Sequence, residues 1–171
     1  MRTSTKRLLA AGLLGVLIGV VQIVGSAQRG GSNSAVIGVW RVSELTVTGP
    51  NARKVTNPQP SVVIFTQRYF SIDEVTSNAP RPELPPSDKR TDKQIADAFG
   101  PFIAQAGTYE IKGNEITYKR IAAKNPATMR SGDFIVDTFK MEGKNTLWVT
   151  SKTNQNEPVA NPPTRKLTRL E

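Results

Sequence analysis

The side chains that could do chemistry in this chain are carboxylates and tyrosines, because its 171 residues include no histidine and no cysteine. Without histidine the chain lacks the usual general base and the usual zinc ligand, and without cysteine it lacks thiol nucleophiles and thiolate metal ligands. A Ser-His-Asp hydrolase is therefore excluded, and we expect no metal and no cofactor. The remaining candidate for proton transfer is Glu44, acting with Tyr109 or Tyr118.

Apolar and polar residues alternate along most of the chain after residue 35, which is typical of strands with one buried face. We predict eight strands separated by turns rich in Gly, Asn and Pro. Eight is the number at which an antiparallel barrel can hold one small ligand. The predicted fold is therefore an all-β, eight-stranded antiparallel barrel, with strands at 36–47, 61–66, 69–76, 107–111, 115–122, 134–141, 146–152 and 165–170.

One short helix interrupts the strands. Residues 78–86 contain four prolines and cannot pair within a sheet, whereas Thr91 and Gln94 have the spacing of a capping box that begins a helix. We predict that this helix follows the third strand and lies over one opening of the barrel.

The first 27 residues have the pattern of a signal peptide: basic residues, a long apolar run, then small residues ending at Ala27. We favour cleavage before Gln28 and a periplasmic or secreted protein, although the same run could stay as a membrane anchor. The predicted organisation is a signal peptide at 1–27, a flexible linker at 28–35 and a barrel domain at 36–171.

The net charge of +9 falls to +6 if Arg2, Lys6 and Arg7 leave with the signal peptide. The remaining basic residues are scattered among acidic ones and form no stripe interleaved with aromatic residues, so we expect no nucleic-acid partner. Contact with anionic lipid or the cell envelope is an alternative. We expect a monomer.

Several short motifs follow the order of a known family. They are Gly38-Val39-Trp40, Pro58-Gln59-Pro60, Tyr69-Phe70-Ser71, Arg81-Pro82, Ala106-Gly107-Thr108-Tyr109 and Asn125-Pro126-Ala127. Over residues 36–171 the chain resembles the bacterial lipocalin-like domain family of the calycin superfamily. The resemblance implies a barrel that binds a ligand and names no substrate.

The first strand predicts how one end of the barrel is closed. Gly38 lets two chain segments approach closely, Trp40 plugs the floor, and Arg169, or else Arg165, stacks on the indole. Alternation predicts a ligand-binding lumen lined by Trp40, Glu44, Phe65, Tyr109, Tyr118, Phe139 and Trp148.

We therefore expect a protein that binds a small hydrophobic molecule in the barrel lumen without covalent chemistry. One alternative is an isomerase or cyclase on the same barrel that uses a lumen carboxylate. The other is an envelope interaction protein or inhibitor that acts through its loops, with residues 78–90 as the contact. Whether the protein is an enzyme stays open, and a binding protein is the preferred reading.

Overall fold

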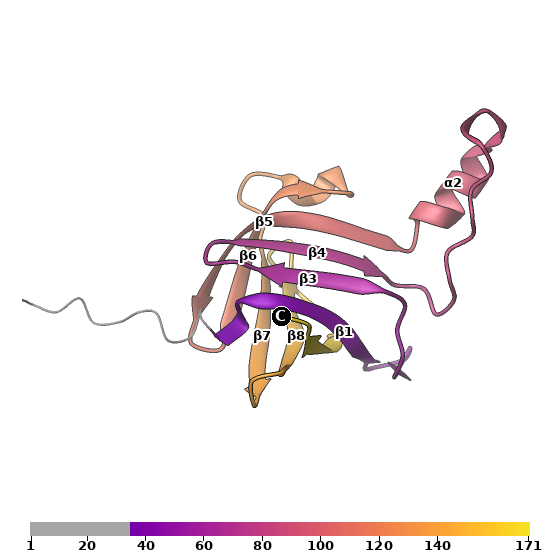
Figure 1. Cartoon of the computed structure of the whole chain (residues 1–171). Helices are drawn as coiled ribbons and strands as arrows, with labels where there is room; N and C mark the ends of the chain where they lie inside the picture. Colours follow the sequence, from indigo (N-terminus) through magenta and orange to yellow (C-terminus); the bar gives the residue numbers. More distant parts are fainter. Residues whose placement is uncertain (1–34) are drawn as a thin grey trace, which may run out of the picture.

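The computed structural model describes residues 35–171 (Figure 1). The predicted signal peptide at 1–27 and nearly all of the predicted linker lie outside the described residues. No helix between Ala35 and Glu171 combines the length and hydrophobicity needed to cross a bilayer.

The described chain is made almost entirely of strands. Its elements are β1 (Gly38–Val47), β2 (Arg53–Val55), β3 (Ser61–Phe65), β4 (Tyr69–Val75), the 3-10 turn η1 (Ser87–Lys89), the helix α2 (Asp92–Phe99), β5 (Phe102–Lys112), β6 (Glu115–Ala123), the 3-10 turn η2 (Pro126–Met129), β7 (Ile135–Glu142), β8 (Thr146–Asn154), β9 (Glu157–Pro158) and β10 (Thr164–Arg169).

The sheet closes on itself. Its strands run in the order β10-β1-β3-β4-β5-β6-β7-β8, every neighbouring pair is antiparallel, and β10 also pairs with β8. The short strands β2 and β9 only extend the edges of β1 and β8. The predicted all-β, eight-stranded antiparallel barrel is therefore confirmed.

The predicted helix is present and begins at the predicted capping box. The Thr91 hydroxyl accepts a hydrogen bond from the Gln94 amide, and the Gln94 side chain accepts one from the Thr91 amide, so the capping box is formed. The helix follows the strand predicted as the third, at 69–76, which is β4 once the short strand β2 is counted, so its place in the chain is as predicted. In Figure 1 it stands apart from the barrel, beyond the ends of β4 and β5, so it does not cover the opening as predicted.

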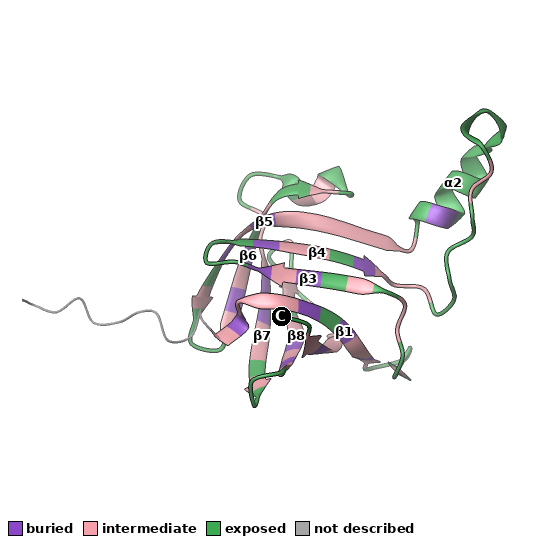
Figure 2. Cartoon of the chain, in the orientation of Figure 1, coloured by how far each residue is buried: buried purple, intermediate pink, exposed green. Residues whose placement is uncertain are grey.

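The distance between helix and barrel has a local cause. The preceding segment is proline-rich and extended, and Ala98 is the only buried residue of the helix, as Figure 2 shows. The end of the helix is held by Lys124, whose ammonium donates hydrogen bonds to the carbonyls of Phe99, Gly100 and Phe102. The helix is thus fixed at its base and free of the barrel along its length.

The other end of the barrel is closed by the first strand and the last. Trp40 is fully buried, and its indole N–H donates to the Val36 carbonyl at 2.8 Å. The Arg169 guanidinium lies 4.0 Å from the centre of the Trp40 ring and donates to the carbonyls of Ala35 and Ile37. Gly38 has φ +143°, and a Cβ there would lie 2.3 Å from Arg169 Nη1. A side chain at this glycine would displace the arginine.

Candidate functional site

A cavity of about 520 Å³ occupies the end of the barrel opposite Trp40. It is lined by the ends of β4, β6 and β8 and by the starts of β5, β7 and β10, which alternate in direction around the barrel and so meet at one rim. The turn η2 contributes Thr128, and the residue before it, Asn125, also lines the cavity. An eight-stranded barrel is wide enough to hold one small ligand in a space of this kind.

The depth of the cavity is apolar. Its walls there belong to Val63, Phe65, Ile72, Val149 and Leu167, which alternate with outward-facing residues on their strands. Below them aromatic rings fill the barrel. The Phe65 ring meets the Tyr109 ring edge-on at 5.1 Å, and the Phe70 ring meets the Tyr118 ring edge-on at 4.9 Å. Packing of this kind gives the cavity a firm floor.

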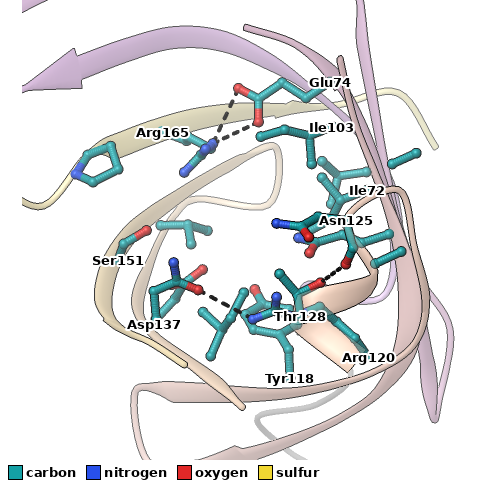
Figure 3. Close-up of a pocket in the computed structure, with 18 of the residues that line it drawn as sticks. Ile72, Glu74, Ile103, Tyr118, Arg120, Asn125, Thr128, Asp137, Ser151 and Arg165 are labelled. Carbon is teal, nitrogen blue, oxygen red and sulfur yellow. Dashed lines mark hydrogen bonds and ion pairs between the residues drawn. The ribbon is translucent and has the colours of Figure 1, made fainter. Parts of the chain in front are cut away.

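Above the apolar walls lies a ring of charged side chains, which we call the polar belt: Glu74 on β4, Arg120 on β6, Asp137 on β7 and Arg165 on β10. All four residues line the cavity, and Figure 3 shows the belt with Ser151, Asn125 and Thr128 around the same space. The belt holds two carboxylates and two guanidinium groups.

Two belt members neutralise each other. Arg165 Nε donates to the Glu74 carboxylate at 3.1 Å, and the side chains of Glu74 and Arg165 are 5% and 23% exposed. Their strands are separated by β1 and β3 in the sheet, so the pair connects distant parts of the barrel wall (Figure 3). Burial makes the loss of either partner costly, because the other charge would remain desolvated.

Asp137 is a buried carboxylate without a comparable partner. It lies opposite Ser151 in the register of β7 and β8, and its Oδ1 atom is buried with no hydrogen bond. Burial raises the pKa of Asp137 to about 6, while the positive charge of Arg165 and the Ser151 hydroxyl oppose this rise. The carboxyl group can therefore gain or lose its proton near neutral pH.

Arg120 is the second belt member with an unpartnered atom. Its Nη2 donates to Asn154 at 3.4 Å, but its Nε is buried and makes no hydrogen bond. Desolvation lowers the pKa of Arg120, whereas nearby Asp133 raises it. Burial, with the charge of Asp137 next in importance, raises the pKa of Tyr118 well above its usual range, so this phenol stays neutral.

Five of the seven predicted lumen residues face the interior. Phe65 and Tyr118 line the cavity itself. Trp40 and Tyr109 are buried in the core beneath it, where the Tyr109 hydroxyl donates to the Thr66 carbonyl at 2.5 Å. Phe139 packs against the same core without lining the cavity. The structure thus assigns these last three residues to the packing below the cavity.

Glu44 does not line the cavity. The pairing of β1 with β10 shifts between Val42 and Glu44, and this bulge places Leu45 among the buried residues instead. Glu44 Oε2 then pairs with the Lys54 ammonium at 3.1 Å on the neighbouring strand β2. A bulge reverses the inside and outside assignment beyond it, which is why alternation counted from Trp40 fails here.

Trp148 also lies away from the cavity. Its neighbours Leu147 and Val149 are the buried residues of β8, so the indole points outward. There its N–H donates to Glu142 at 2.8 Å, and the Lys166 ammonium lies 5.2 Å from the ring centre. The run Leu147-Trp148-Val149 is apolar throughout, so alternation alone does not identify its inner face.

The predicted site omitted the whole polar belt, although alternation contains a signal for two of its four residues. Residues two apart on a strand share a face. Arg120 is two residues after Tyr118, and Asp137 is two residues before Phe139. Taking every second residue without regard to charge would have placed both in the lumen. The Glu74–Arg165 contact spans 91 positions, and no local pattern predicts it.

Nothing in the described part of the chain resembles a metal centre, since residues 35–171 contain no group of three or more acidic side chains gathered as ligands. Hydrogen-bonding and ionic groups are therefore the chemical resources of the cavity. It offers one ion pair, one carboxylate with a pKa near neutrality, one guanidinium and an apolar interior.

No protein-family model matches the chain, and no curated protein matches it either. Two solved structures are similar in outline. A redesigned β-barrel is 11% identical, with 81% of this chain and 95% of that chain covered and a TM-score of 0.40. An uncharacterized protein from Bacteroides eggerthii DSM 20697 is 9% identical, with 78% and 98% covered and a TM-score of 0.41.

Proposed function

We propose that this protein binds one small, largely apolar molecule in the cavity at the open end of the barrel. The observation that carries the proposal is the form of the cavity: about 520 Å³, with a mainly apolar lining and a few polar groups gathered in the belt. Ligand sites in proteins generally combine a mostly apolar lining with a few polar groups that fix orientation.

A neutral fluorescent dye, N-phenyl-1-naphthylamine, tests this proposal. It should bind with one-to-one stoichiometry, because the closed barrel has one lumen and the proposed site lies in it. Val63 lines the cavity, whereas Val62, the preceding residue, is 39% exposed on the outer face. Val63→Trp should fill the space and abolish dye binding, while Val62→Trp, the matched control, should bind like the parent.

Ile72→Trp, which enters the same space from β4, gives a second cavity-filling variant if Val63→Trp does not fold. Circular dichroism checks the barrel in each case. A folded parent that binds no dye would refute the proposal and favour the alternative in which residues 78–90 contact a partner. Equal binding by the filled variants and by Val62→Trp would show that the dye binds elsewhere.

A lipocalin-like relationship and export belong to the same proposal. The closed eight-stranded order and the stacking of Arg169 on Trp40 support the first, and the pattern of residues 1–27 supports the second. Mass spectrometry of the protein from fractionated cells tests export. We expect a soluble form that begins at Gln28, and an intact chain in the membrane pellet would contradict it.

Asp137 favours one second candidate, an isomerase that moves a proton. A buried carboxyl group with a pKa of about 6 is suited to general acid–base catalysis near neutral pH. An apolar β,γ-unsaturated ketone in D2O provides the test, because a base that removes its α-proton causes deuterium uptake visible by NMR. Uptake should be lost in Asp137→Asn and kept in Glu44→Gln. No uptake with the parent would count against this enzyme.

A further inference from the structure

The polar belt contains two buried atoms that are left without hydrogen bonds, Asp137 Oδ1 and Arg120 Nε. Buried polar atoms in native proteins are nearly always paired, so two such atoms in one cavity wall need an explanation. One is an acceptor whenever Asp137 is charged, and the other is a donor. Both residues line the cavity, and their side chains extend into the same space in Figure 3. A ligand could complete both.

The charges of the belt determine which ligand fits. Glu74 and Arg165 neutralise each other at 3.1 Å, and Asp137 and Arg120 then contribute one negative and one positive charge. The belt as a whole is therefore neutral when Asp137 is ionised. Lys124 also lines the cavity, but it is exposed and its ammonium is bound to the carbonyls of Phe99, Gly100 and Phe102. A ligand with a net charge would bring an unmatched charge into a partly desolvated site, which is unfavourable.

We propose that the ligand has an apolar body and an uncharged head group that both donates and accepts hydrogen bonds, as a carboxamide does. The apolar body lies among Val63, Phe65 and Val149, while the head group donates to Asp137 and accepts from Arg120. This inference rests on the proposed binding function and specifies its ligand class. Simple carboxylates and amines satisfy only one of the two atoms.

A matched series of eight-carbon probes tests the head group: octanamide, octanoate, octylamine and octan-1-ol, each competing with the dye at about pH 7.5, where Asp137 is ionised. Octanamide should bind most tightly. Octanoate and octylamine should each be weaker by about tenfold or more, since each carries an unmatched charge. Octan-1-ol donates and accepts through a single atom, so its affinity should lie between that of octanamide and those of the two charged probes.

Two substitutions should change this order in opposite directions. Asp137→Asn gives the belt a net positive charge, so the affinity of octanoate relative to octanamide should rise. Arg120→Gln gives the belt a net negative charge, so the affinity of octylamine relative to octanamide should rise instead. The matched control is Arg41→Gln, because Arg41 is exposed on β1 outside the cavity and should leave the order unchanged. Reciprocal shifts of this kind would not follow from a loss of packing.

The outcomes separate this inference from the binding function. If the dye binds and is competed equally by all four probes, the cavity binds apolar molecules and the head-group inference is wrong. If octanoate or octylamine binds most tightly to the parent, it is also wrong. If neither the dye nor any probe binds the folded parent, the binding function itself fails and the inference fails with it. A variant that does not fold leaves the parent series and the other variant as tests.

Discussion

Replacing Arg169 by alanine should remove a connection between the two ends of the described chain. The guanidinium donates to the carbonyls of Ala35, Ile37 and Lys144 at 2.6 to 2.8 Å and stacks on Trp40 at 4.0 Å. At about 0.5 to 1 kcal/mol for each hydrogen bond and a similar amount for the stack, the loss is about 3 kcal/mol.

Urea unfolding followed by circular dichroism measures this loss. With a slope of about 1.5 kcal/mol per M, the midpoint should fall by about 2 M with the slope unchanged. Arg169→Lys keeps the positive charge but not the forked geometry of the guanidinium, so its urea midpoint should lie between those of the parent and of Arg169→Ala. Arg41→Ala is the control, since Arg41 is exposed one residue from Trp40. The reasoning is refuted if Arg169→Ala and Arg41→Ala have the same midpoint.

The belt and the sheet give three further predictions, all measured by urea midpoints. The pKa of Asp137 is raised from 3.8 to about 6, so its ionisation disfavours the folded state, and this cost is absent below about pH 4 and complete above about pH 6. Asp137→Asn should therefore be more stable than the parent at pH 7.5, by up to about 3 kcal/mol, and equal to it near pH 4; an equal difference at both pH values would contradict this. Glu74→Gln should cost about 2 to 4 kcal/mol by leaving a buried arginine charge, whereas Glu44→Gln, in a more exposed pair, should cost less than about 1. Similar losses in these two variants would exclude that explanation. Gly107→Ala should destabilise by more than about 2 kcal/mol, because its Cβ would lie 2.0 Å from the Lys119 carbonyl oxygen, and a parent-like midpoint would show that β6, which has a bulge at Ile121 opposite Gly107, can relax.

Local sequence patterns were sufficient to predict the barrel. Alternation and turn residues located its eight long strands, and the capping box at Thr91 located the helix. The stacking of Arg169 on Trp40 that was expected at the closed end is also present in the structure. These features depend on residues close in sequence or on the two ends of a closed sheet, which is why one sequence is enough to suggest them.

The expectation that the helix covers the opening and the predicted inner face of two strands were wrong for physical reasons. A capping box starts a helix but does not determine where its preceding loop carries it. The bulge after Val42 turned Glu44 out of the lumen, and the apolar run around Trp148 concealed which face is buried. The pairing of Glu74 with Arg165 depends on closure of the whole sheet, so it required the three-dimensional structure.

The stacking of Arg169 on Trp40 at the closed end of the barrel also determines which way the cavity faces. The amide of Val39 donates to the Glu171 carbonyl, so the beginning and the end of the described chain meet at the closed floor, while the cavity opens at the opposite rim. Anything joined directly at Ala35 or at Glu171, whether a surface, an affinity tag or a second protein, is attached behind the floor. A protein tethered at either residue would hold the cavity opening away from its point of attachment. A ligand could then enter or leave the cavity while the protein stays attached.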